Sequence, residues 1–149
     1  MLFANTLREE LAFGPKNIGL DATTTERNML RAAQAMGLQD RLDQSPFALS
    51  FGQQKRASIA SVLAMGTRML VMDEPTAGQD ADHAERFMQD IVQDAQLSTG
   101  AILFTTHDLD FARRYANRVI ILGDGRIEFD GLPEVALDDQ ALLQTCGLD

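Results

Sequence analysis

The stretch Met69-Leu-Val-Met-Asp-Glu-Pro-Thr76 decides how the rest of the sequence is interpreted. Its four leading residues form a continuous apolar run, the pattern of a short strand buried on both faces of a parallel sheet. Asp73 and Glu74 follow at the carboxyl end of that strand, where open α/β sheets bind their ligands. Adjacent carboxylates there repel each other unless a cation is present. The stretch therefore predicts either a site for a metal and an activated water, or a simple acidic turn ended by Pro75.

The sequence after this stretch alternates between helix and strand patterns. Strands that alternate with helices indicate an α/β fold with a mainly parallel sheet. An Asp-Gly pair between two apolar segments, here Asp124-Gly125, indicates a hairpin at the end of the sheet. In chain order, we expect a helix over 81–97, a strand over 101–105, a helix over 109–115 and strands over 119–122 and 126–129. Two short helical pieces should follow at the C-terminus.

The sequence before the stretch predicts helices only. A capping-box pattern, Thr6-x-x-Glu9, opens a first helix that Gly14-Pro15 should end. Two more helices are expected over 24–36 and 51–65, separated by a polar linker in which Ser45-Pro46 breaks any helix. The second helix has an apolar stripe at helical spacing, formed by Met29, Leu30, Ala33 and Met36. We therefore expect a helical lobe over residues 1–66 and an α/β part over residues 67–149.

A second candidate site is Leu49-Ser-Phe-Gly-Gln53, at the start of the third helix. The first turn of a helix exposes unpaired N–H groups and the positive end of the helix dipole, which suit an anion such as phosphate. Ser50 and Gly52 are small enough for a phosphate to approach the backbone. Ser50 with Gln53 also forms an ordinary capping box, so a purely structural N-cap explains the same residues.

The third candidate is His107, which follows the strand ending in Phe104-Thr105. A single histidine is more often a structural residue than a catalytic one. This one would lie at the same edge of the sheet as Asp73, where its imidazole can hydrogen-bond a γ-phosphate.

The composition limits the classes of function. Thirteen basic and 22 acidic residues give a net charge of −9 with no basic cluster, which argues against a nucleic-acid or anionic-lipid partner. No apolar run approaches the roughly 20 residues that cross a bilayer, and the first residues do not resemble a secretory signal. The single cysteine, Cys146, fits a reducing compartment. We therefore expect a cytoplasmic protein.

Taken together, the three groups resemble the ATP-binding-cassette (ABC) ATPases, in the order in which that family has them. Leu49 to Gln53 resembles the family's signature sequence, with Phe51 in place of the usual first glycine. Leu70 to Glu74 resembles the Walker B strand, which implies that Asp73 associates with the metal and Glu74 is the general base. Ala77-Gly-Gln-Asp80 resembles the D-loop, which includes Asp80, and His107 matches the switch histidine.

The resemblance implies a P-loop NTPase-like fold, with ATP and Mg²⁺ as ligands. It also implies a head-to-tail dimer with a second ABC ATPase subunit, in which Ser50, Gly52 and Gln53 meet the partner's nucleotide. A transmembrane permease subunit would hold the ATPase on the cytoplasmic face of the membrane. Several short segments are similar to the ATPases of energy-coupling-factor importers, which take up cobalt, nickel or vitamins. They are Leu2–Thr6, Ala12–Pro15, Ile121–Ile127, Asp130-Gly131 and Leu142-Leu143.

The sequence contains no phosphate-binding loop of the form Gly-x-x-x-x-Gly-Lys-Ser/Thr. Its two lysines, Lys16 and Lys55, do not follow a glycine. We therefore expect a C-terminal fragment of an ABC ATPase, arising from a deliberate truncation, a split gene or a misplaced start. Alone it should be inactive, and it should self-associate through strand edges that lack neighbours.

Two alternatives remain open at this stage. The intact protein could be a soluble ABC ATPase of DNA repair or translation, although the acidic charge and the lack of a coiled-coil insertion disfavour this. The chain could also be a non-catalytic interaction subunit encoded by a split gene.

Overall fold

The structure, a computed structural model, describes residues 2–78, 81–98 and 100–148; within 81–98, the side chains of residues 81, 83 and 94–98 are not described. The chain divides into two compact units. The first comprises Met1–Val71 with Gly78–Leu103, and the second comprises Met72–Ala77 with Phe104–Asp149.

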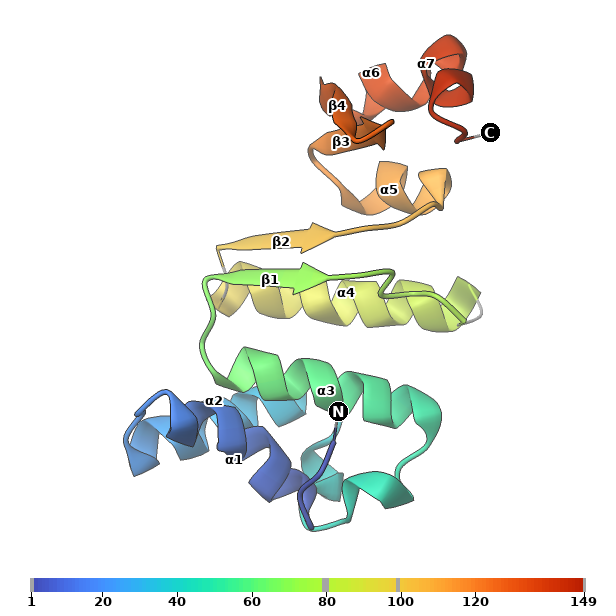
Figure 1. The fold of residues 1–149 in the computed structure, drawn as a ribbon. Helices are drawn as coiled ribbons and strands as arrows, with labels where there is room; N and C mark the ends of the chain where they lie inside the picture. The colour runs from blue at the N-terminus through green and yellow to red at the C-terminus, as the bar shows by residue number, and fades with distance from the viewer. Residues whose placement is uncertain (1, 79–80, 99, 149) are drawn as a thin grey trace. The chain divides into compact units, whose positions relative to one another are not determined.

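Three helices form most of the first unit: α1 (Leu7–Asn17), α2 (Ala22–Ala35) and α3 (Phe51–Ala64) (Figure 1). Both expected capping boxes are present, because Thr6 and Ser50 each cap a helix and exchange hydrogen bonds with the residue three positions on. Two short 3₁₀ helices, η1 (Gln39–Arg41) and η2 (Pro46–Ala48), occupy the expected linker between α2 and α3. Capping boxes therefore place the starts of α1 and α3 correctly, whereas α2 begins two residues before the expected start, with Asp21 as its N-cap.

The expected end of the first helix at Gly14-Pro15 is wrong, because α1 continues to Asn17. Pro15 removes one N–H donor, but the Gly14 carbonyl still accepts from the Ile18 amide at 3.1 Å. The glycine has a packing role instead: a Cβ there would lie 2.8 Å from Cγ of Met65, at the end of α3. Gly14 thus permits close contact between α1 and α3, which sequence signals for helix ends do not reveal.

The core of the first unit lies between α1, α2 and α3. Met29, Ala33 and Met36 of the expected apolar stripe are fully buried, whereas Leu30 is 43% exposed. One carboxylate is also buried here. Glu10 accepts hydrogen bonds from the amides of Phe3 and Ala4, at 2.9 and 2.8 Å, which compensates for its lost hydration. Among the described residues, the large apolar side chains that are fully buried include Leu7, Leu11, Met29, Met36, Leu38, Met88 and Ile91.

Strands β1 (Met69–Met72) and β2 (Ala101–Phe104) pair in a two-stranded sheet, and helix α4 (Ala81–Ser98) connects them. The strand arrows point the same way in Figure 1, which confirms the expected parallel pairing. The expected burial of β1 on both faces is wrong for the residues described. Leu70 and Met72 are buried, but Met69 and Val71 are 56% and 64% exposed. An apolar strand is covered on both faces only when other elements supply both layers.

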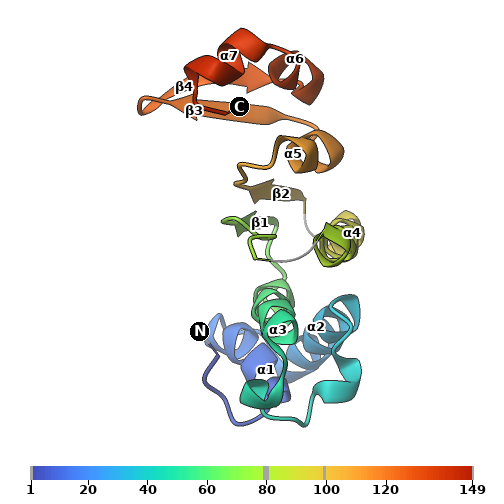
Figure 2. The ribbon, with the colours of Figure 1, turned by 90° about the vertical axis from the view of Figure 1, so that its right-hand side faces the viewer.

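The second unit contains α5 (Leu109–Tyr115), β3 (Val119–Gly123), β4 (Arg126–Gly131), α6 (Pro133–Leu137) and α7 (Gln140–Thr145). Strands β3 and β4 form the expected antiparallel hairpin, with Asp124 and Gly125 both at positive φ in the turn. Helices α6 and α7 lie over this hairpin (Figure 2). A small core holds the unit together, made of Ala112, Ile121, Ala136, Leu137 and Leu143.

The compact units differ from the expected lobes. Helix α4 and most of β1 and β2 group with the helical residues. Helix α4 contacts α2, and its Phe87, Met88 and Ile91 are buried. The expected division at residues 66 and 67 concerns functional lobes and stays a prediction. Among the described residues, no helix combines the length and the apolar character needed to cross a bilayer.

Candidate functional site

Two of the predicted site segments meet in the second compact unit, where β1 and β2 end. The Thr105 amide donates to the Met72 carbonyl at 3.0 Å, which aligns the two strand ends. Asp73 and Glu74 leave β1 at this point, and His107 follows β2. The parallel topology therefore brings together side chains more than thirty residues apart in the sequence.

Thr105 connects the two acidic residues to β2. Its hydroxyl donates to Oδ1 of Asp73 at 2.5 Å and accepts from the Glu74 amide at 3.0 Å. Thr105 is not among the site residues predicted from the sequence. The available signal was its place directly after a strand that neighbours the acidic strand, where polar side chains face a ligand edge.

Glu74 has an unusual backbone conformation. Its φ is 43°, in the left-handed region that residues with a side chain seldom adopt. The following residue is Pro75, which favours an extended conformation for the residue before it. Such a conformation persists only where surrounding contacts hold it. The Glu74 amide bonds to Thr105 and the Glu74 carbonyl accepts from Ala77 at 3.1 Å, so both sides of the residue are held.

Glu74 and His107 form a direct pair. Nδ1 of His107 lies 2.9 Å from Oε1 of Glu74, and the imidazole is 81% exposed. The hydrogen bond to Glu74 raises the pKa of His107 above its ordinary value, and the charges of Glu74 and Asp108 act in the same direction. The carboxylate thus fixes the imidazole's orientation while most of the ring faces solvent.

The donor set at this edge suits a hard cation. Asp73 is exposed at the strand end, and Mg²⁺ in nucleotide sites takes one or two carboxylates together with phosphate and water oxygens. Within the described ranges, no three His, Cys, Asp or Glu side chains are grouped as a metal cage. The chemistry of these residues is therefore compatible with a Mg²⁺ that arrives with a nucleotide, and Asp73 is the carboxylate that would hold it.

The signature-like segment lies in the first compact unit. Oε1 of Gln53 accepts from the Ser50 amide at 2.9 Å, and Oγ of Ser50 accepts from the Gln53 amide at 3.4 Å. Gly52 is helical, and a Cβ placed there would meet no atom within 4 Å. Neither backbone conformation nor packing inside this unit requires a glycine, and Phe51 beside it is 76% exposed. This turn is free to contact a ligand or another protein.

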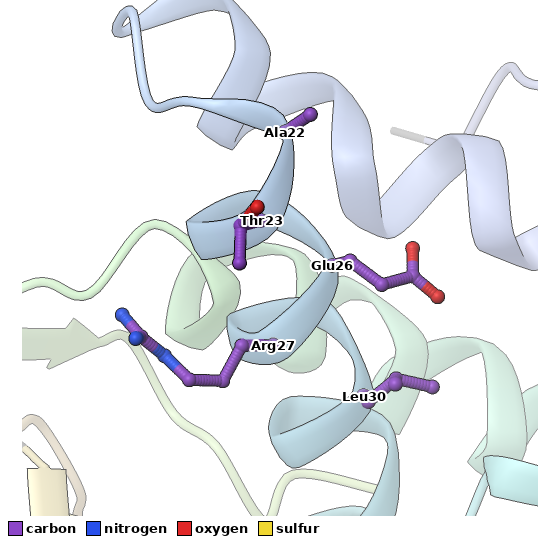
Figure 3. Close-up of a pocket in the computed structure, with 5 residues that line it drawn as sticks. All are labelled: Ala22, Thr23, Glu26, Arg27 and Leu30. Carbon is purple, nitrogen blue, oxygen red and sulfur yellow. The ribbon is translucent and has the colours of Figure 1, made fainter.

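Two other features contribute less. Asp80, the predicted D-loop residue, lies outside the residues that the structure describes. An open, shallow depression on α2 is lined by Ala22, Thr23, Glu26, Arg27 and Leu30 (Figure 3). Glu26 is paired with Arg8 at 2.9 Å, and the depression gathers no reactive group apart from these surface charges.

Several known proteins are similar to this chain. The sequence pattern of the ABC transporter family matches residues 2–77, which include the signature-like turn and both adjacent carboxylates. The energy-coupling factor transporter ATP-binding protein EcfA of Methanocaldococcus jannaschii is 36% identical over 147 residues, covering 99% of this chain and 52% of that protein. EcfA2 of Symbiobacterium thermophilum is 38% identical over 148 residues, covering 99% of this chain and 51% of that protein.

Solved structures give the same result. CbiO1 of Clostridium perfringens, described as part of the ABC transporter complex CbiONQ, superposes with a TM-score of 0.84 at 29% identity, over 99% of this chain and 59% of that one. An ATP-binding cassette of an ABC transporter in its ADP conformation has a TM-score of 0.79 at 21% identity, which supports the fold alone. The expected P-loop NTPase-like α/β fold is confirmed.

The chain belongs to the ABC transporter family. Its resemblance to the energy-coupling-factor ATPases is confirmed by relatives of that name. The chain spans about half the length of the curated relatives that it matches.

Proposed function

We propose that this chain forms part of an ATPase that drives import of a metal ion or a vitamin through an energy-coupling-factor transporter. The observation that supports this most is the array of Asp73, Glu74, Thr105 and His107 at the paired strand ends. In this proposal the array combines an acidic metal ligand, a general base and a hydrogen-bond donor to the γ-phosphate, the groups that phosphoryl transfer to water uses.

Each residue has a distinct role in this proposal. Asp73 would hold Mg²⁺, which when bound would supply charge neutralisation for the phosphates. Glu74 orients the attacking water and accepts its proton. Nδ1 of His107 faces Glu74, so in the doubly protonated imidazolium form Nε2 is the nitrogen that would donate to the γ-phosphate oxygen. The bond to Glu74 favours that protonated form.

We also propose the family's assembly for this chain. A second ATPase subunit would meet it head to tail, so that Ser50, Gly52 and Gln53 contact the nucleotide held by the partner, with Asp80 in the D-loop between them. A transmembrane permease would bind the helical lobe at the cytoplasmic face of the membrane. The lack of packing around Gly52 supports an external contact at the signature turn.

The chain alone should neither bind nor hydrolyse ATP. The preorganised amides and the lysine of a phosphate-binding loop supply most of the stabilisation in phosphoryl transfer, and this sequence has no such loop. Asp73 and Glu74 cannot replace them, because carboxylates repel phosphate when no metal lies between.

The test compares three proteins. One is the chain alone, one is the part of the M. jannaschii relative that this chain does not match, and one joins that part to the start of this chain. Mg-ATP binding is measured by calorimetry and turnover by phosphate release. We expect steady turnover only in the joined protein. Micromolar affinity with turnover in the chain alone would contradict the proposed incompleteness, and an inert joined protein that still binds ATP would contradict the assignment as an ATPase.

A further inference from the structure

We propose that Thr105 is a positioning residue for the reaction, because its hydroxyl holds Asp73 and the backbone of Glu74 in one arrangement. This inference rests on the proposed function for its catalytic meaning, but its geometric part concerns the chain itself. Thr105 lies in the same compact unit as both acidic residues, so the contacts do not depend on how the two units are arranged.

The Thr105 hydroxyl uses both of its hydrogen-bonding capacities. Its single proton is donated to Oδ1 of Asp73, and one lone pair accepts the Glu74 amide proton. The direction of each bond is settled, because a backbone amide can only donate and an ionised carboxylate can only accept. One oxygen atom therefore sets the distance between the metal-ligand carboxylate and the start of the strained turn.

Thr105 is itself well fixed. Its amide donates to the Met72 carbonyl at 3.0 Å, which ties its backbone to the last residue of β1. Its branched Cβ restricts rotation about χ1. A hydroxyl on such a residue is a rigid contact point, unlike a water molecule or a long flexible side chain.

Glu74 needs such a contact. Its left-handed φ of 43° ahead of Pro75 is a conformation that the backbone of Glu74 would leave if no other residue held it. In an extended conformation its carboxylate would point elsewhere and the 2.9 Å pair with His107 would be lost. The bond from the Glu74 amide to Thr105 thus positions the base and, through it, the histidine.

The neighbouring Thr106 has a different task, which makes the assignment specific. Its hydroxyl accepts from the Asp108 amide at 3.1 Å, in the turn that leads into α5. Only the first threonine of the pair contacts the carboxylate segment in the part of the chain that the structure describes.

The first experiment uses NMR on the 149-residue chain. Thr105→Val keeps the shape and removes the hydroxyl, Thr105→Ser keeps the hydroxyl, and Thr145→Val is the control on an exposed α7 hydroxyl that bonds to Ala141. The readouts are the exchange rate of the Glu74 amide and the strong amide-to-Hα NOE within Glu74 that a positive φ produces. We expect the NOE to weaken and exchange to quicken at least tenfold in Thr105→Val, and to stay unchanged in the other two.

The second experiment uses the joined ATPase described above. Thr105→Val should lower kcat by roughly three- to thirtyfold, the effect of one lost hydrogen bond, with the KM for ATP changed less than twofold. Thr105→Ser should restore most of kcat. A general folding defect caused by any change at this position would lower the fraction of active enzyme in both the Thr105→Val and the Thr105→Ser protein. Serine would then not restore kcat.

The outcomes separate this inference from the proposed function. A Thr105→Val chain that keeps the Glu74 NOE and slow exchange overturns the inference, as does a joined Thr105→Val protein with the parental kcat. If the unsubstituted joined protein does not hydrolyse ATP, the proposed function fails. The NMR comparison then still decides whether Thr105 holds Glu74.

Discussion

The signature-like turn and the carboxylate edge are built in different ways. Ser50 and Gln53 satisfy each other over three residues, through bonds that any capped helix can make. The carboxylate edge joins residues more than thirty positions apart and keeps Glu74 in a left-handed conformation. The first is local and unstrained, and the second is long-range and strained.

This difference shows where each site's functional evidence lies. At the carboxylate edge, strain and convergence inside one compact unit argue for function. At the signature turn, the internal contacts are fully explained by helix capping. At the signature turn, function is indicated by Gly52, because no packing within the unit requires its small size. A test of the first site should change its chemistry, and a test of the second should separate stability from activity.

The largest effect is expected for Glu74→Gln in the joined ATPase. The substitution keeps the shape and removes the base, so turnover should fall by about 10²- to 10⁴-fold while ATP binding is retained. Phosphate release and calorimetry measure the two quantities. Glu128→Gln, at an exposed position in β4, is the control. Turnover at the parental rate in Glu74→Gln would remove the base assignment.

A slightly smaller loss is expected for His107→Ala in the same protein. Removing one preorganised donor to the reacting phosphate typically lowers kcat by about 10²-fold. Because His107 is exposed and lies outside the small core, the unfolding midpoint should fall only slightly, by the small contribution of an exposed pair with Glu74. An unaffected kcat would leave the pair with Glu74 as a purely structural contact.

Gly52→Ala should separate activity from stability at the signature turn. A Cβ there meets no atom, so the free energy of unfolding of the chain should stay constant or rise by up to about 1 kcal/mol. Turnover of the joined ATPase should nevertheless fall, because in the proposed dimer the added methyl would face the partner's nucleotide. Gly14→Ala is the matched contrast, since its Cβ would crowd Met65 and cost about 1 kcal/mol. Urea unfolding measures the free energy of unfolding of both variants, and phosphate release measures the turnover of the joined ATPase.

The exposed face of β1 and β2 makes the chain's association state a further test. Met69, Val71 and Leu103 are 56%, 64% and 51% exposed on strands that have only each other as described neighbours. We expect the purified chain to self-associate there, because unpaired strand edges with apolar side chains invite pairing. In light scattering, Val71→Lys should reduce the mass and Val135→Lys, on α6, should not. A monodisperse monomer with protected amides throughout β1 and β2 would contradict this prediction.

The sequence predicted most of the secondary structure because its signals are local. Capping residues such as Thr6 and Ser50 mark helix starts, and Asp124-Gly125 marks the hairpin turn. The end of α1 was missed because the role of Gly14 depends on Met65, about fifty positions later. The exposed face of β1 was missed because an apolar run does not tell which layers cover it.

The sequence predicted only part of the site, because it reveals the order of the strands but not their register. Glu74 and His107 could be placed at one edge from the order of strands alone, and they do form a direct pair. Thr105 could not be chosen over Thr106, because only the register between β1 and β2 decides which hydroxyl faces Asp73. The left-handed conformation of Glu74 could not be predicted either, because the following proline favours an extended one.

The smallest expected effect is the titration of His107 in the chain itself. The bond to Glu74 raises the pKa of His107 above 6.5, so the charged pair stabilises the fold fully below pH 6.5 and is lost as pH rises through the raised pKa. NMR of the imidazole protons should give a pKa above 6.5, and Glu74→Gln should bring it back toward that value. Asp108→Asn should lower it less, because Asp108 contributes only a minor charge effect. An unchanged titration in Glu74→Gln would mean that the pair does not persist in solution, and that the carboxylate edge is less preorganised than the signature turn.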